Sequence, residues 1–166
     1  MTAPVVVQNG RALAREKLPR LELSALRRTI IEHCAAGGRV AALFGVPAEG
    51  ALELWAVLVS DEAGELSAAC AVVEGEAYPS MTPECPAVHL FERELAEQWG
   101  LRPQGHPWFK PVRFVKSSRP GVDAWQRPHD PQVGVMDYYR VEGEEVHEVA
   151  VGPVHAGVIE PGHFRF

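Results

Sequence analysis

The 166-residue sequence contains only three cysteines, Cys34, Cys70 and Cys85, and they stand far apart. No Cys-x-x-Cys pair is present, so the sequence predicts neither a disulfide framework nor a zinc or iron–sulfur site built from cysteines. Cys85 precedes a predicted helix, a position that can activate a thiol, but Glu84 opposes ionisation and Pro86 offers no N–H. A small packing residue is therefore the better interpretation of Cys85.

Long apolar runs are also missing. No run approaches the roughly 20 residues that span a bilayer, and Met1–Pro4 shows no basic segment leading into the apolar segment of a secretory signal. Hydrophobic residues make up 46% and charged residues 23%, which is typical of a folded globular chain. We therefore expect a soluble, cytoplasmic domain that has no membrane anchor of its own.

Basic residues are absent between Arg39 and Arg93, where nine acidic residues lie, and the net charge is −6. The stretch Arg102–Arg119 is the reverse, with five basic residues and no acidic one. Because the acidic block would repel phosphate, nucleic-acid binding is not expected. The basic run is either a solvated loop or a docking strip for an acidic partner, and the sequence leaves both open.

Motifs of common enzyme classes are missing as well. The seven histidines include no His-Glu-x-x-His pair, no serine lies in Gly-x-Ser-x-Gly, and no glycine-rich loop is suited to a phosphate. Hydrolase and nucleotide-binding interpretations therefore have no support. The alternative that stays open from the enzyme class is a free-standing small metal-dependent enzyme that uses His106 or His155.

What is present is a series of short amphipathic elements. Apolar residues recur at three- and four-residue steps from Leu23 to Cys34, which predicts a helix over residues 25–36. Three strand-like runs follow, over residues 40–46, 52–60 and 66–73. The turn at 61–64 predicts a hairpin between the last two. Because the middle run is apolar on both sides, we expect it to be the central strand.

A second predicted helix begins after Pro86 and ends at Gly100. Its apolar stripe consists of Ala87, Leu90, Phe91, Leu95 and Trp99. Prolines favour loop or extended chain over residues 101–131, and 133–139 and 146–151 are predicted as further strands. The expected fold is α+β, with a mainly antiparallel sheet of four or five strands and two helices packed on it.

Three charged residues, Glu92, Arg93 and Glu94, interrupt the apolar stripe of the second helix. Because Phe91 and Leu95 are expected to face the core, Glu92 and Arg93 are predicted on the solvated flank and Glu94 near its boundary. Ion pairs on such a flank contribute only about a few tenths of a kcal/mol. The alternative is that Arg93, the first cation after a long acidic stretch, belongs to a docking surface. The charge pattern favours neither.

Five short motifs share their order and spacing with a known family. They are Tyr78–Pro83, Pro86-Ala87, Phe91–Glu94, Gly100-Leu101 and Gly105–Pro107. This pattern, from about Leu23 to Phe114, resembles the C subunit of proton-pumping NADH:quinone oxidoreductase (respiratory complex I).

The C-terminal residues favour one branch of this family. Gly152–His155 and Glu160–Phe166 resemble the start of the large-subunit domain in membrane-bound, complex-I-related nickel–iron hydrogenases. Trp108–Pro111 stands where complex I members usually carry paired arginines, and the Arg/Lys–Asp–Tyr ending of complex I C subunits is missing. The resemblance is therefore closest to the C-like N-terminal domain of these hydrogenase large subunits.

The resemblance implies a non-catalytic structural and assembly subunit, or domain, without a redox centre or metal of its own. It would dock onto the large (D-like) and small iron–sulfur (B-like) subunits of a complex-I-like oxidoreductase, at the inner face of the cell membrane. Iron–sulfur clusters, and a nickel–iron site or quinone, would belong to partner subunits or to downstream sequence.

With the resemblance come site and domain assignments. The predicted partner-docking residues are Glu92, Arg93, Glu94, His106, Lys110 and Arg113, and the predicted large-subunit junction holds His155, Glu160 and His163. We predict a flexible leader over 1–20, a domain like the complex I C subunit over 21–149 and an incomplete large-subunit-like segment over 150–166. This last segment is expected to be disordered, or ordered only against a neighbouring molecule. Whether the chain is one half of a split large subunit or a piece of a longer one stays open.

Overall fold

The computed structural model describes residues 3–8, 10–48, 50–133, 142–152, 154, 156–158 and 160–165. The chain forms two compact units, Met1–Val135 and Met136–Phe166. Among the described residues, neither α-helix has the length and apolar character needed to cross a membrane.

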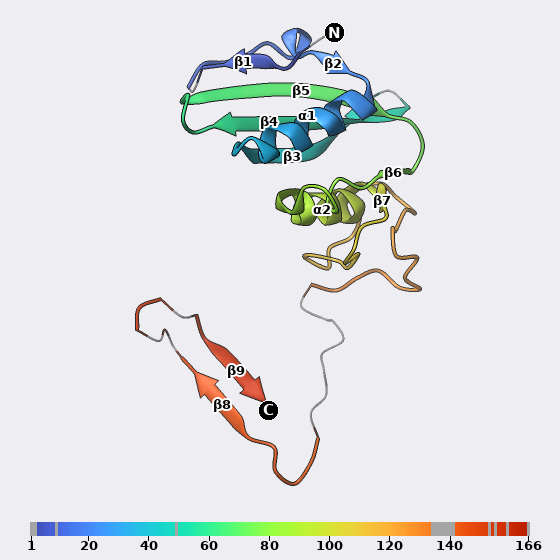
Figure 1. Ribbon diagram of the computed structural model, residues 1–166. Coiled ribbons are helices and arrows are strands. Elements are labelled where there is room, and N and C mark those ends of the chain that lie inside the picture. The colour runs from blue at the N-terminus through green and yellow to red at the C-terminus, as the bar shows by residue number, and fades with distance from the viewer. Residues whose placement is uncertain are drawn as a thin grey trace. The chain divides into compact units, whose positions relative to one another are not determined.

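The first unit contains a five-stranded sheet whose centre is the predicted antiparallel meander (Figure 1). Its three long strands are β3 (Arg39–Ala48), β4 (Ala51–Ser60) and β5 (Glu65–Val73). β4 lies between the other two, as its two apolar sides predicted, and it buries Leu54 and Leu58 on one face and Val59 on the other. Gly64, with φ of 64°, supplies the left-handed conformation in the turn from β4 to β5.

Both predicted helices are present. Helix α1 (Leu23–Ala35) buries Leu26 and Ile30 in the core that β3, β4 and β5 share. Helix α2 (His89–Trp99) follows the short 3-10 turn η2 (Pro86–Val88) and ends at Gly100, whose φ of 70° closes the helix in the left-handed conformation. The α+β fold with a mainly antiparallel sheet and two helices is thereby confirmed.

The N-terminal residues contribute strands that the sequence analysis did not predict. β1 (Val5–Val7) pairs antiparallel with β5, and β2 (Arg20–Leu21) pairs parallel with it. A 3-10 turn, η1 (Arg15–Lys17), lies between them. The flexible leader predicted over residues 1–20 therefore contains paired residues, Val5–Val7 and Arg20. The sequence did not indicate these strands, because runs of two or three residues are too short to show a period of two.

A second, parallel strand pair joins the segment before α2 to the segment after it. It consists of β6 (Ala77–Pro79) and β7 (Arg102–Gln104). Each of these strands contains a proline, Pro79 or Pro103, which agrees with short strands outside the main sheet.

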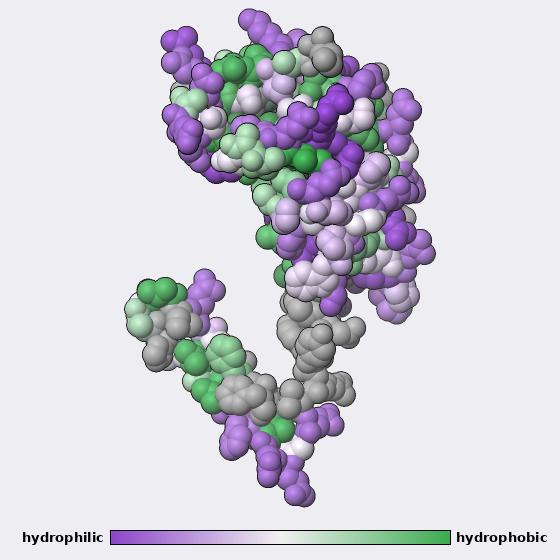
Figure 2. Space-filling view, in the orientation of Figure 1, coloured by the Kyte–Doolittle hydropathy of each residue, from purple (hydrophilic) through white to green (hydrophobic). Residues whose placement is uncertain are grey.

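The second unit holds an antiparallel pair, β8 (Glu148–Val151) and β9 (Gly162–Arg165). The expectation that residues 150–166 are disordered, or ordered only against a neighbouring molecule, was therefore wrong for β9, which pairs with β8 of the same chain. The predicted strand at 133–139 lies outside the described residues except for Val133, which is in a turn. The domain division at 149/150 falls within β8 and stays a prediction. Figure 2 shows hydrophobic residues at the surface of this unit, among them Val149, Val154, Val158 and Phe164.

Candidate functional site

Three charged side chains of α2 lie in the interior of the first unit. The exposed fraction is 0% for Glu92, 7% for Arg93 and 2% for Glu97. The predicted solvated flank for Glu92 and Arg93 was therefore wrong, and so was the predicted core position of Leu90, which is 54% exposed. The apolar stripe located only the side of α2 that faces the sheet. Proline-rich segments before and after the helix cover Glu92, Arg93 and Glu97.

Glu92 binds the segment that leads from β6 into α2. Its carboxylate accepts hydrogen bonds from the backbone N–H groups of Met81 (2.8 Å) and Thr82 (3.1 Å). It also accepts from the hydroxyls of Ser80 and Thr82, both at 2.5 Å. Arg27 of α1 donates to the carbonyl oxygen of Ser80 at 3.0 Å, which connects the same segment to the first helix. One buried carboxylate thus satisfies four donors.

Arg93 binds the loop that follows β7. Its guanidinium donates to the carbonyl oxygens of Lys110 (2.6 Å) and Pro111 (2.8 Å). The guanidinium carbon lies 5.1 Å from the centre of the Trp108 ring. Burial lowers the pKa of Arg93, and the charge of Glu97 opposes that shift. The role of Arg93 in this structure is to fix the backbone of residues 108–111.

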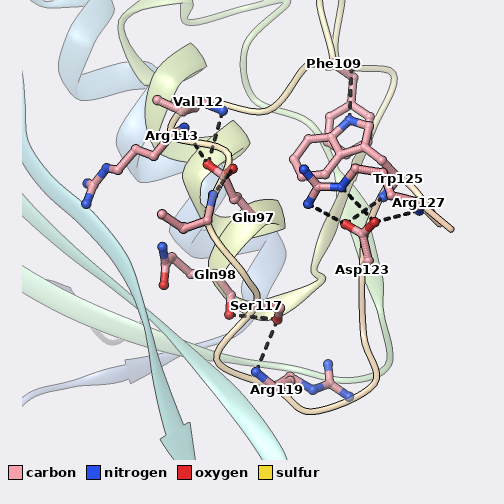
Figure 3. A network of polar contacts seen from close by, with 11 residues as sticks. Glu97, Gln98, Phe109, Val112, Arg113, Ser117, Arg119, Asp123, Trp125 and Arg127 are labelled. Atoms are coloured by element: carbon pink, nitrogen blue, oxygen red, sulfur yellow. Dashed lines mark hydrogen bonds and ion pairs between the residues drawn. The ribbon is translucent and has the colours of Figure 1, made fainter. Parts of the chain in front are cut away.

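Glu97 fixes the next part of the same loop, and the sequence analysis missed it. Its carboxylate accepts hydrogen bonds from the backbone N–H groups of Val112 (3.1 Å), Arg113 (2.8 Å) and Val115 (3.1 Å) (Figure 3). The signal available was its four-residue spacing from Arg93 on one helix face, but helical spacing alone does not distinguish a buried charge from a surface pair.

The C-terminal end of α2 is capped by the same loop. The carbonyl oxygen of Gln98 accepts from the Ser117 hydroxyl (3.0 Å) and the Ser118 N–H (2.8 Å), and that of Trp99 accepts from Arg119 (3.1 Å). The last carbonyls of a helix have no partner within the helix, so these bonds satisfy groups that would otherwise need water. The loop is therefore bound to the helix along the whole length of residues 110–119.

A second cluster holds the loop further along (Figure 3). Asp123 accepts from the backbone N–H (2.7 Å) and the guanidinium (2.8 and 2.9 Å) of Arg127. Trp125 stacks on Phe109, with ring centres 4.7 Å apart and planes 20° apart, and its indole N–H donates to the Phe109 carbonyl oxygen at 3.3 Å.

His106 is the histidine of the predicted site whose side chain the structure describes. Its Nδ1 accepts from the Trp108 N–H at 3.1 Å, and its Nε2 lies 3.2 Å from the His89 carbonyl oxygen. A neutral imidazole with the proton on Nε2 satisfies both contacts. In this state neither ring nitrogen offers a metal a free lone pair, which disfavours His106 as a ligand. The pKa of the adjacent His89 is lowered, mainly by burial and further by the nearby Arg93 and His106.

The remaining residues of the predicted site lie at the surface or outside the residues that the structure describes. Lys110 and Arg113 are exposed, and Arg113 forms an ion pair with Glu94. Glu160 is exposed, the backbone of His163 lies in β9, and His155 lies outside the described residues. The docking and junction roles stay predictions, but Glu92 exposes no surface with which to dock.

The described residues offer little support for a metal site or for a reactive thiol. No group of three or more His, Cys, Asp and Glu side chains among those described is arranged to hold a metal ion, and the prediction of a metal-free chain remains a prediction. Cys85 is buried, in keeping with a packing residue, and burial raises the pKa of Cys34 to about 11. A thiol with that pKa is a poor nucleophile at neutral pH.

The comparisons with known proteins agree with the resemblance seen in the sequence. The family described as "Respiratory-chain NADH dehydrogenase, 30 Kd subunit" matches residues 21–121. Formate hydrogenlyase subunit 5 of Escherichia coli is 34% identical over 101 residues, which are 53% of this chain and 17% of that protein. Hydrogenase-4 component G of the same organism is 29% identical over 140 residues, 77% of this chain and 23% of that protein. The chain thus spans less than a quarter of either relative's length. It belongs to the family of the respiratory-chain NADH dehydrogenase 30 kDa subunit.

Proposed function

We propose that this member of the 30 kDa subunit family is a structural and assembly subunit, or domain, of a complex-I-like, membrane-associated oxidoreductase of the hydrogenase type. The observation that supports the proposal is that the buried charged side chains of α2 form hydrogen bonds to backbone groups. Glu92, Arg93 and Glu97 bind backbone groups of the chain's own loops. Charged side chains used in this way hold neighbouring segments of the chain in place, which is a structural role.

The names of the two relatives favour the hydrogenase branch. In our proposal the chain docks onto the large subunit and the small iron–sulfur subunit of such a complex. Iron–sulfur clusters, and a nickel–iron site or quinone, belong to those subunits or to sequence beyond this chain. Association with the inner face of the membrane then depends on the partners.

The second unit belongs to the same proposal as the junction with the large subunit. This unit exposes several large hydrophobic side chains, which in order of exposed fraction are Val158 (84%), Val154 (56%), Phe164 (51%) and Val149 (43%). Apolar surface of this kind supports a contact with another protein surface. His155, Glu160 and His163 are assigned to that junction.

Reconstitution tests the proposal. The chain is co-expressed with the hydrogenase-type large and small subunits encoded in the same genome, and the products are separated by size-exclusion chromatography. We expect one complex that contains all three polypeptides. Bound metal in the purified complex is expected to partition with the other two subunits when the chain is dissociated from them.

The opposite result is equally clear. Stoichiometric metal in the isolated chain, or a redox or hydrolytic activity of the chain alone, would favour the free-standing enzyme and overturn the proposal. Elution of the chain apart from both subunits would overturn its docking role.

A further inference from the structure

Trp108 is the largest apolar side chain on the loop that Arg93 and Glu97 hold, and it is 56% exposed. It stands in the middle of the basic run of residues 102–119. Cations lie on its ring: the Arg93 guanidinium carbon at 5.1 Å from the ring centre and the Lys110 ammonium at 5.7 Å. Tryptophan and arginine are among the residue types that most often dominate the energy of protein interfaces.

The backbone that carries Trp108 is held in place before any partner binds. Its own N–H donates to Nδ1 of His106 at 3.1 Å, and its carbonyl oxygen accepts from the Lys110 N–H at 3.1 Å. Arg93 holds the carbonyl oxygens of Lys110 and Pro111. A side chain presented on a fixed backbone loses little conformational entropy on binding, so its burial contributes more of its gross energy to affinity.

The charges around Trp108 differ from those of the rest of the basic run. Arg113 pairs with Glu94, Lys116 with Asp130 and Arg119 with Glu76. For Arg102 and Lys110 no carboxylate partner is found among the described residues. Each instead lies over an aromatic ring, Arg102 at 5.8 Å from Phe109 and Lys110 at 5.7 Å from Trp108. Two cations without a carboxylate partner in the described part of the chain thus lie beside two adjacent aromatic side chains.

We propose that Trp108 is the anchor of a docking patch, formed with Arg102, Phe109 and Lys110, that binds an acidic segment of a partner subunit. The inference rests on the proposed function and names the surface that serves it. The two cations match a short run of carboxylates. They are too few for nucleic acid or an anionic membrane, since such surfaces engage about four to ten basic residues. Opposite charges at the rim of an interface steer and orient the partner, and the aromatic group supplies the buried contact.

The test measures the dissociation constant of the purified chain for the co-purified large and small subunits at low and physiological salt. Trp108→Ala and Lys110→Glu are compared with two matched controls outside the patch, Val6→Ala and Lys17→Glu, which remove an exposed apolar side chain and reverse an exposed lysine. We expect the dissociation constant of each patch variant to rise by about tenfold or more. Lys110→Glu is expected to reduce the salt dependence, and both controls are expected to bind as the unchanged chain does.

Carbodiimide cross-linking identifies the occupant, because it joins the Lys110 amine directly to a contacting carboxylate. We expect a cross-linked peptide that joins Lys110 to an aspartate or glutamate of a partner subunit. A cross-link from Lys110 to Glu142, Glu144 or Glu145 of the same chain would overturn the proposal in favour of an internal contact. Binding to anionic phospholipid vesicles that Trp108→Ala abolishes would overturn it in favour of a lipid surface.

The two proposals fail in distinguishable ways. A complex that forms with unchanged affinity when Trp108 and Lys110 are replaced would overturn the docking patch and leave the subunit role intact. A chain that binds neither subunit overturns both. Circular dichroism melting of each variant separates lost binding from lost folding. Melting is expected to stay close to that of the unchanged chain, because Trp108 and Lys110 are mostly exposed and the bonds of Arg93 to the loop backbone remain.

Discussion

Replacing Glu92 by alanine should destabilise the chain strongly, even though the residue is a charged one on a helix. The substitution leaves the backbone N–H of Met81 without an acceptor, in a site where Glu92 itself is fully buried. The N–H of Thr82 loses its bond to Glu92 and keeps only the bond to the Ser80 hydroxyl oxygen at 3.2 Å. Each unsatisfied buried donor costs about 1–3 kcal/mol. The hydroxyls of Ser80 and Thr82 also lose a charged acceptor, although they can rotate toward other groups.

One unsatisfied N–H and three weakened or lost hydrogen bonds together cost about 2–6 kcal/mol, against a typical total stability of about 5–15 kcal/mol. Glu92→Gln keeps the shape and one acceptor oxygen, so we expect a smaller loss of about 1–3 kcal/mol. Glu94 is the matched control, since it lies two residues away on the same helix with a side chain 36% exposed and one surface ion pair. Glu94→Ala is expected to cost less than about 1 kcal/mol.

Urea unfolding at neutral pH, followed by far-ultraviolet circular dichroism, measures the three variants on one scale. The order of free energies of unfolding is expected to be Glu94→Ala, then Glu92→Gln, then Glu92→Ala, from most to least stable. If Glu92→Ala unfolds within about 1 kcal/mol of Glu94→Ala, the hydrogen bonds at Ser80–Thr82 do not hold the fold, and the reasoning is refuted.

Three further predictions use the same unfolding assay. Leu95→Ala is expected to cost about 2–5 kcal/mol and Phe91→Ala distinctly less, because Leu95 is 2% exposed while Phe91 is only partly buried; equal losses would contradict this. Gly100→Ala should cost about 1–3 kcal/mol, since φ is 70° and the added Cβ would clash with Cγ1 of Val122, whereas a variant as stable as the unchanged chain would show that the helix end shifts freely. Hydrogen bonds from Trp55 and Arg15 lower the pKa of Glu53. The stability that ionised Glu53 contributes is therefore complete above the unfolded pKa of about 4.3, and it is lost as the pH falls through the lower folded value. Glu53→Gln should therefore reduce the loss of stability on acidification, and an acid unfolding profile equal to that of the unchanged chain would contradict this.

The elements that the sequence predicted are those whose apolar residues are periodic. Leu26 and Ile30 of α1, and the doubly apolar β4, indicate which surfaces they bury, because apolar burial is non-directional and its free energy is roughly proportional to the buried area. Gly100 could be assigned as the end of α2 because few residues other than glycine adopt its conformation.

The candidate site could not be predicted in the same way, because its order depends on directional bonds between distant segments. Glu97 and Arg113 are separated by 16 positions in the sequence, and nothing local in either residue indicates that the carboxylate accepts from that N–H. The same holds for Glu53, whose partners Arg15 and Arg20 lie in the stretch interpreted as a leader. A buried charge is stable only when its partners are supplied, and those partners become visible only when the chain is folded.

The distribution of the family-like residues between interior and surface has a functional consequence. Glu92 and Arg93, within the motif that carries the resemblance, are buried and bind backbone groups of neighbouring segments. Trp108 and Lys110 are exposed on the loop that Arg93 holds. A change at a buried supporting residue alters stability, whereas a change at the exposed tip alters what the surface binds at little cost to the fold. If the proposed docking patch is correct, substitutions at Trp108 or Lys110 are therefore expected to change what the chain binds, while substitutions at Glu92 or Arg93 are expected to change its stability.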